Sequence, residues 1–449
     1  MKICYFFSFY LLTSGILFSQ DCNCKHLLRE IYKKVESNYA GYHDKITSTN
    51  KQSYNQLKGR LLKKASSGKV QCIEVIDEFL YFFKDPHTIL NQENAVLIKD
   101  TSLKLTNPSN PQKTIEGMWY NTQNESSIYI QKKGNRYLGY VVNPSDTNFG
   151  FGTLQFDLKN VSNNRYRGIL YNKHKQKIIY EVSHERDQLV VQFLATYTRS
   201  NQTTKLERSF IFKMLNDSVS YIKLPSFSSF YRKLCDSLVE SNRREIERSK
   251  YLIIDVRDNG GGTIYSFSKV FDYIYTNPTG FVSGFYFASS ENIAKAKESL
   301  ERAKKYLDSS QIRSREKFIR QLESSAGKLY FEPPDTLRRK NVYITPQKIV
   351  ILANNNTGSA AEMFIIMAKQ NKKTILAGTR TAGASDYLEP LLYNFCNDEF
   401  VIGIPWIKRT RLEYKQDIDN VGIKPDYSIE NAPDQWVEFV VNKILSRND

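Results

Sequence analysis

The clearest absence in this 449-residue sequence is a long apolar run anywhere beyond the first twenty residues. No later segment reaches the run of about 18 apolar residues that indicates a membrane-spanning helix. Internal repeats and low-complexity tracts are absent as well, which excludes repeat architectures. We therefore expect a soluble mature protein without stable membrane insertion.

The one long apolar run lies at the start of the chain. Lys2 gives a positively charged beginning, residues 3–18 are almost uninterruptedly apolar, and polar residues follow from Ser19. Such a run is short for a membrane span and typical of a secretory signal, with cleavage near Ser19 or Gln20. We expect residues 1–20 to be a signal peptide and the protein to be exported, to the periplasm or the medium.

Cysteine is scarce, with six residues in the chain, of which Cys4 leaves with the signal peptide. The odd number that remains permits one or two disulfides and a free thiol; these residues are Cys22, Cys24, Cys72, Cys235 and Cys396. The first three flank one helical region, which makes them candidates for a bridge. For a zinc site, His26 is the only histidine near these cysteines, and the spacing of the residues fits no familiar zinc finger. Disulfides are favoured, and we expect no metal or other cofactor.

A concentrated basic stripe is also missing, although Lys and Arg outnumber Asp and Glu by 64 to 47 and the formal net charge is +17. The basic residues are scattered along the chain rather than clustered with interleaved aromatics. This distribution favours a solvated basic surface over a nucleic-acid site. We expect no nucleic-acid partner.

The residues after the signal fall into three regions with different sequence patterns. Residues 21–100 are helical, with apolar positions at helical spacing from 27 to 35 and a second helix over 71–83. Asp85-Pro86 ends that helix, which places His87 just beyond it. Residues 110–213 alternate as short strands between turn residues, typical of an antiparallel sheet or small barrel that serves as a scaffold.

The third region, residues 214–449, has the pattern of alternating strands and helices, with a charged helical insertion at about 285–340. Its expected strands and helices are a strand at 219–224, a helix at 231–248, strands at 251–256 and 348–353, a helix at 359–370 and a strand at 374–377. Ser359 therefore follows a buried strand and opens a helix, at the sheet edge where α/β sites gather.

Ser359 has two interpretations. The N-terminus of a helix presents free N–H groups and a positive dipole end, which suit an anionic tetrahedral intermediate. Ser359 and Glu362, three residues apart, also form a plain capping box, and this stretch alone favours a cap. Similarly, His87 and Asp419 taken alone are better explained as structural residues.

Three glycines, Gly260, Gly261 and Gly262, follow the predicted strand at 251–256. They match neither the Walker loop nor Gly-x-Gly-x-x-Gly, which excludes the two common nucleotide-binding loops. Glycine allows close backbone approach and positive φ, and its amides can form an oxyanion nest. A turn is nevertheless the better interpretation of these three residues alone.

Several motifs, in one order, resemble the C-terminal processing protease and tricorn core family of serine peptidases. They are residues 220–227, 252–262, 358–362, 377–383 and 421–426. The likeness spans about 217–430 apart from the insertion. It implies an α/β catalytic core of the ClpP/crotonase type, with a mixed sheet and flanking helices, beside the N-terminal helical domain and a separate antiparallel β domain.

The motifs also point to one branch of that family. The Ser-Lys processing proteases carry a lysine directly after the Gly of a T-x-G motif, where this chain has Ala384. The tricorn-like branch uses Ser-His with an orienting acid, and Asp85-Pro86-His87-Thr88 resembles its histidine segment. The corresponding acid is Asp419, in a position where that branch usually has Glu.

The resemblance implies an endopeptidase that forms an acyl-enzyme on Ser359, with His87 as general base and Asp419 holding its tautomer. Backbone N–H groups of Gly261 and Ala360 would stabilise the oxyanion, supported by Gly260 and Glu362. The expected partner is a peptide or protein substrate, and a homo-oligomer stays open. The alternatives are an inactive member that binds peptides or lipophilic ligands, and a non-peptidase hydrolase.

Overall fold

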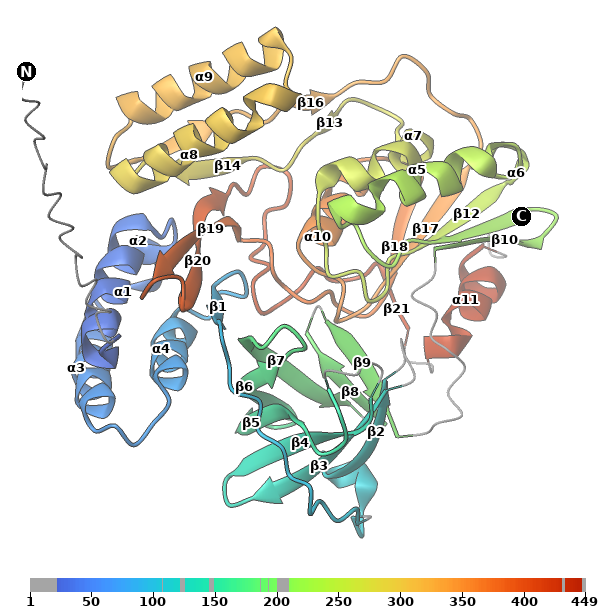
Figure 1. Ribbon diagram of the computed structural model, residues 1–449. Coiled ribbons are helices and arrows are strands. Elements are labelled where there is room, and N and C mark those ends of the chain that lie inside the picture. The colour runs from blue at the N-terminus through green and yellow to red at the C-terminus, as the bar shows by residue number, and fades with distance from the viewer. Residues whose placement is uncertain are drawn as a thin grey trace, which may run out of the picture.

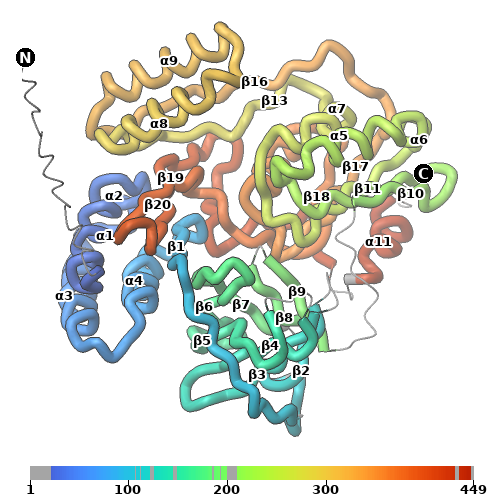
Figure 2. Tube along the Cα trace, viewed as in Figure 1, coloured from blue at the N-terminus to red at the C-terminus, as the bar shows by residue number. Residues whose placement is uncertain are grey.

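The computed structural model describes eight stretches of the chain, and the expected signal peptide lies outside them. They are residues 22–106, 108–121, 126–144, 149–185, 187–192, 194–199, 210–429 and 433–445. Within these stretches the protein is a mixed α/β molecule in which a helical region, a β barrel and an α/β core meet (Figures 1 and 2).

The helical region comes first and ends just before His87. It comprises α1 (Cys24–Asn38), α2 (Tyr42–Lys45), α3 (Lys51–Ser66), α4 (Cys72–Leu80) and a 3₁₀ turn, η1 (Tyr81–Phe83). The helix expected over 71–83 is α4 with its 3₁₀ continuation. Lys84 then takes a left-handed conformation, with φ of 48°, and the chain leaves the helix.

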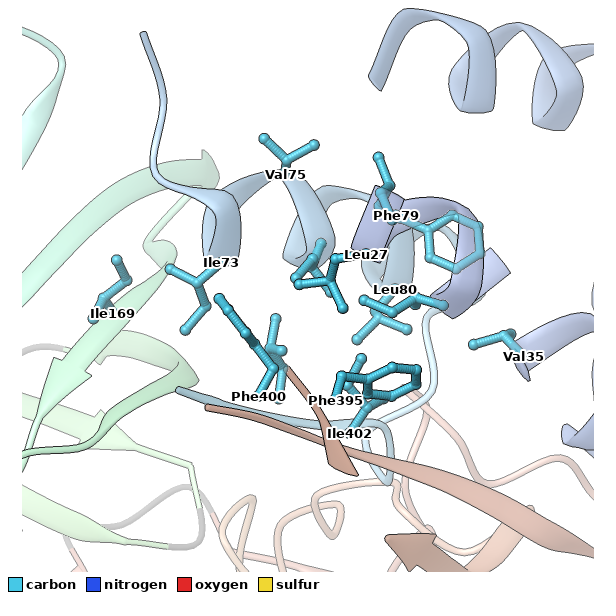
Figure 3. Close-up of a cluster of buried hydrophobic side chains, with 14 of the residues drawn as sticks. Leu27, Val35, Ile73, Val75, Phe79, Leu80, Ile169, Phe395, Phe400 and Ile402 are labelled. Atoms are coloured by element: carbon cyan, nitrogen blue, oxygen red, sulfur yellow. The ribbon is translucent and has the colours of Figure 1, made fainter. Parts of the chain in front are cut away.

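A β hairpin from the far end of the sequence packs against these helices. The hairpin is β19 (Tyr387–Phe395) and β20 (Phe400–Arg409), and the short strand β1 (Ile89–Gln92) pairs with β20. Figure 3 shows the apolar side chains of α1 and α4 gathered over this hairpin. Leu27, Phe79 and Ile402 are almost completely buried there, and burial of each such side chain typically contributes about 1.5–3 kcal/mol.

Two disulfides reinforce the same contact. Cys24 is bonded to Cys72 and Cys22 to Cys396, so one bridge closes the helical region and the other ties it to the hairpin. Cys235 is a buried free thiol. The expectation of disulfides with one thiol left over is confirmed, and the partner of Cys22 lies 374 residues away.

Removal of the long-range disulfide tests how much it stabilises the fold. We expect the double variant Cys22→Ser/Cys396→Ser to lose about 2–5 kcal/mol of unfolding free energy, because its unfolded chain gains conformational freedom. Urea unfolding monitored by circular dichroism measures the change. Cys235→Ala is the matched control, and an equal loss there would mean that the bridge itself adds nothing.

The second region is a closed antiparallel barrel. Its strands are β2 (Gly117–Asn121), β3 (Ser127–Lys133), β4 (Arg136–Asn143), β5 (Leu154–Ser162), β6 (Arg165–Tyr171), β7 (Lys177–Glu185), β8 (Gln188–Val191) and β9 (Ala195–Thr198). Its strands pair in sequence order, and pairing of β2 with β9 closes it around buried Trp119, Phe156 and Val191. The barrel is not a separate unit, because the start of β7 also pairs with the end of β1.

The third region is built on a six-stranded mixed sheet in the order β10-β11-β12-β17-β18-β21. These strands are β10 (Ile211–Asn216), β11 (Val219–Lys223), β12 (Tyr251–Asp255), β17 (Lys348–Ala353), β18 (Thr374–Gly378) and β21 (Tyr427–Ser428). Only β10 is antiparallel to its neighbour. Since β10 begins at Ile211, this sheet starts before the boundary expected at residue 214.

Helices cover both faces of that sheet (Figure 1). They are α5 (Arg232–Ser241), α6 (Arg243–Arg248), α7 (Ser268–Ile274), α10 (Ala360–Ala368) and α11 (Trp436–Phe439), with a π-helical turn over Val440–Leu445. The single helix expected over 231–248 is wrong: it breaks at Asn242, whose side chain donates to the Leu238 carbonyl.

The insertion contains β14 (Gly284–Phe287), α8 (Ser290–Ala303), α9 (Ser309–Ser324) and β15 (Leu329–Glu332). Its strand β14 pairs with β20, and Glu291 of α8 accepts from Lys34 of α1. The remaining short elements are η2 (Pro111–Lys113), η3 (Ser229–Tyr231), η4 (Ile264–Phe267), β13 (Thr279–Gly280), η5 (Lys304–Tyr306), β16 (Thr336–Leu337) and η6 (Pro433–Gln435). Among the described residues, no helix has the length and apolar content needed to cross a bilayer.

Candidate active site

Two loops at the carboxyl edge of the parallel sheet are fastened to each other. One follows β12 and the other follows β17, and these strands are neighbours. Thr357 Oγ1 donates to the Val256 carbonyl at 2.8 Å, and Gly358 N–H donates to the Asn259 carbonyl at 3.0 Å. These bonds fix the turn that carries Ser359 against the glycine loop.

Ser359 occupies a strained turn between strand and helix. Its φ is 53° and its ψ is −122°, values that L residues adopt only where the surrounding structure imposes them. Gly261 makes this approach possible, since a Cβ there would lie 2.8 Å from both Ser359 Cβ and Ala360 N. The geometry is that of a nucleophile held out at the start of a helix.

His87 reaches Ser359 from the loop between η1 and β1. Asp85 orients its backbone by accepting from His87 N–H at 2.8 Å, and the following strand β1 is paired with β20. His87 Nε2 lies 3.1 Å from Ser359 Oγ, which is hydrogen-bond distance. Burial lowers the pKa of His87 below 6.5, and the charge of Glu362 opposes this shift. The imidazole is therefore neutral near pH 7, the state that can accept a proton.

Glu362 is completely buried beneath Ser359 and receives five hydrogen bonds. The donors are Ser359 N, Thr381 Oγ1, Gly383 N, Ala384 N and Ser385 Oγ. Its carboxylate thereby links the start of α10 to the loop after β18. The bond with Ser359 N–H is half of the expected capping box, while the Ser359 hydroxyl faces His87.

Asp419 lies in a cluster of acidic residues, and no hydrogen bond joins it to His87. Its Oδ1 accepts from Ser385 N–H and Asp386 N–H at 2.9 and 2.8 Å. Within the described residues, Asp419 Oδ2 and His87 Nδ1 are both buried without a hydrogen-bond partner. Burial and the charge of Asp85 raise the pKa of Asp419 to about 8, and burial raises the pKa of Asp85 to about 6.

The expected oxyanion donors differ from what the structure contains. Gly261 N–H already donates to Asn259 Oδ1 at 2.9 Å, so the prediction that it faces the oxyanion needs correction. Gly260, rather than Gly261, lines the cavity beside Ser359. Ala360 N–H, at the first turn of α10, has no acceptor among the described residues, which leaves it available.

The catalytic pair opens into a cavity of about 360 Å³ between β1, the 3₁₀ turn η1 and the barrel strand β7. A second cavity of about 450 Å³ adjoins it, and the two share Glu181, Gln192 and Asn420. The barrel thus forms one wall of the cleft that contains Ser359. No group of three His, Cys, Asp or Glu side chains suited to a metal ion occurs in the described parts of the chain.

Residues 218–429 match the family model of peptidase family S41. This part of the chain belongs to that family. The chain is accordingly a serine-type peptidase, a hydrolase that acts on peptide or protein substrates. Ser359 lies within the matched residues of the S41 domain, whereas His87 and the barrel lie outside them.

The similarity to solved structures extends along this chain beyond the S41 domain. Mature CPAF complexed with lactacystin is 14% identical, covers 95% of this chain and 99% of its own, and has a TM-score of 0.53. Mature CPAF alone is 12% identical over 95% and 97%, with a TM-score of 0.52. The photosystem II D1 C-terminal processing protease is 14% identical over 91% and 93%, at 0.43. For the two CPAF structures, at such identities, the likeness concerns the fold alone. None of the curated proteins matches the sequence.

The buried carboxylate beneath the nucleophile gives a stability prediction. We expect Glu362→Ala to lose about 3–5 kcal/mol of unfolding free energy, because it leaves several buried donors without an acceptor. Urea unfolding measures the loss. Glu298→Ala on the exposed face of α8 is the control and should change stability by less than about 0.5 kcal/mol; comparable losses in both variants would contradict the assignment.

Proposed function

We propose that this S41 enzyme is an exported endopeptidase that forms an acyl-enzyme on Ser359 with His87 as general base. The distance of 3.1 Å between His87 Nε2 and Ser359 Oγ carries the proposal. The lowered pKa of His87 supports it, because a neutral imidazole can take the hydroxyl proton.

In the first step His87 Nε2 accepts the Ser359 proton as Oγ attacks the peptide carbonyl. The tetrahedral oxyanion receives a hydrogen bond from Ala360 N–H, with Gly260 N–H as the second donor in place of Gly261. His87 then gives the proton to the departing amine, which leaves an ester on Ser359. Water, deprotonated by His87, hydrolyses this ester and regenerates the hydroxyl.

Cleavage within a chain, rather than at its end, is supported by the two adjoining cavities. They meet at Asn420, and Ser359 lines the first of them, so a bound chain has room to continue past the nucleophile. The site resembles the tricorn-like branch because the side chain at Ala384 carries no base and is fully buried. The parallel strands flanked by helices support a ClpP/crotonase-like core.

Export is supported by two independent features. Residues 1–20 have the pattern of a secretory signal, although they lie outside the described residues. The two disulfides are typical of proteins that fold in an oxidising compartment. We therefore infer a periplasmic or secreted enzyme.

A second candidate function is that of an inactive peptide-binding relative. The absence of a hydrogen bond between Asp419 and His87, together with the bond between Gly261 N–H and Asn259, favours it. The cleft would then hold a peptide without cleaving it. Chemical labelling of Ser359 separates the two candidates, because only an activated serine reacts quickly with an electrophilic phosphonate.

A fluorophosphonate probe tests the Ser359 assignment directly. We expect labelling of the unaltered enzyme, none in Ser359→Ala, and a loss of about 10³-fold or more in the labelling rate of His87→Ala. Asp419→Asn should lose about tenfold or less, because no hydrogen bond to His87 is removed. Ser310→Ala on the surface of α9 is the control. Labelling that persists in Ser359→Ala would move the nucleophile elsewhere.

The pH dependence of labelling tests the base. Because burial lowers the pKa of His87 below 6.5, the neutral form persists to a lower pH than in a free imidazole. The labelling rate should therefore fall only as the pH drops through a midpoint below 6.5. Labelling reactions stopped at timed intervals, in buffers of different pH and constant ionic strength, give the midpoint of this fall. A value above that of free histidine would contradict the assignment.

A further inference from the structure

The outer face of the barrel forms one wall of the second cavity. Side chains alternate between the two faces of a strand, and Tyr166 of β6 and Val182 of β7 belong to the barrel core. Their neighbours Arg165, Glu181 and Ser183 therefore point outward, and all three line the cavity of about 450 Å³. Figure 1 shows that β7 and β8 lie on the side of the barrel nearest the α/β core. The cavity thus lies between the barrel and the core.

The opposite wall consists of loops at the carboxyl edge of the parallel sheet. One loop follows β17, and another, which carries Arg380, follows β18. Thr381, the next residue, donates from Oγ1 to the buried Glu362 carboxylate. The same carboxylate accepts from Ser359 N–H at 3.2 Å. The loop that carries Arg380 is therefore fixed to the turn that holds the nucleophile.

The two arginines of this cavity are not paired with a carboxylate of the described residues. Arg165 makes no salt bridge within the described ranges, and its side chain is exposed. Arg380 donates from Nη1 to the Gly422 carbonyl at 3.2 Å, which leaves other N–H groups of its guanidinium available. The one carboxylate that lines the cavity, Glu181, is bound to Arg167 at 3.0 Å. The lining therefore carries an excess of positive charge.

This excess of charge suits a carboxylate. Guanidinium groups bind carboxylates through charge-assisted hydrogen bonds that are often bidentate. The formal net charge of +17 acts in the same direction, because a basic surface raises the local concentration of acidic substrates. The second cavity also adjoins the one that contains Ser359, and Asn420 lines both. A peptide bound at Ser359 can therefore place one of its side chains there.

We propose that the second cavity selects substrates with an Asp or Glu side chain near the scissile bond. An extended peptide that passes Ser359 continues past Asn420, and Arg165 from the barrel and Arg380 from the core bind its acidic side chain. The inference rests on the proposed function for the chemistry at Ser359. It gives a role in specificity to strand β6, which lies outside the residues of the matched family model.

Internally quenched peptides that are acetylated and amidated at their ends test the preference. Glu is exchanged for Gln at successive positions on each side of the scissile bond. At one position we expect kcat/KM to be about five- to tenfold higher with Glu, a modest factor because both arginines are exposed. This ratio should approach one in Arg165→Gln/Arg380→Gln, and Arg380→Glu should favour Lys at that position instead. The ratio should also fall as the ionic strength rises.

The matched control is Arg313→Gln/Arg315→Gln, which removes the same charge from exposed positions of α9 and should keep the ratio of the unaltered enzyme. An equal fall in this control would assign the preference to overall charge and overturn the proposal. A ratio near one in the unaltered enzyme would also overturn it. A second series of peptides with a free C-terminus distinguishes the side chain from the chain end, and a preference confined to that series would contradict the proposal.

Two further measurements complete the test. Thermal unfolding monitored by circular dichroism confirms that the variants are folded, and a general loss of activity cancels because the ratio compares two peptides in one variant. Fluorophosphonate labelling of the unaltered enzyme without a Glu preference would refute this inference alone, whereas absence of labelling would refute the proposed function. In the latter case fluorescence anisotropy measures binding of the same peptides, and equal affinity for the Glu and Gln peptides would overturn the inference as well.

Discussion

The pairing of β1 with β20 is the contact on which the candidate site depends. Ser359 is held by the parallel sheet, whereas His87 comes from the helical region, and the two residues are 272 positions apart. The histidine keeps its place because β1 begins two residues later and is fixed along its whole length to β20. The apolar cluster of Figure 3 and the Cys22–Cys396 bridge in turn hold β20 against the helices.

The strain at Ser359 is balanced by bonds that come from several loops. A positive φ in a serine persists only where neighbouring bonds over-determine it. The Glu362 carboxylate accepts many of these hydrogen bonds, and Thr357 and Gly358 donate the bonds that join the turn to the neighbouring loop. The nucleophile is therefore positioned by a rigid scaffold, which limits how far it can move when substrate binds.

The sequence predicts the parts of the site that rest on local patterns. The strand at 348–353, the turn after it and the helix that begins near Ser359 follow from apolar runs and a capping box. The pairing of Ser359 with His87 could be inferred only from the family resemblance, because it joins distant segments. No local pattern predicts β1, which is four residues long and does not alternate in polarity.

Other features depend on side-chain geometry that spacing does not encode. The amide of Gly261 is bound by Asn259, two residues before it, and this contact is decided by one rotamer. One carboxylate oxygen of Asp419 accepts hydrogen bonds from two backbone amides of a loop that is distant in sequence. The closure of the barrel also joins segments that are far apart in the sequence, since β2 pairs with β9.

The Cys22–Cys396 bridge closes most of the chain into one covalent loop, which runs from the end of the expected signal to the hairpin turn. A single backbone cut between these two residues would therefore not release a fragment under oxidising conditions. For an enzyme that cleaves peptide bonds, this means that self-inflicted nicks in exposed loops need not separate His87 from Ser359. Separation of His87 from Ser359 by a single cut within this loop should then require reduction as well as cleavage.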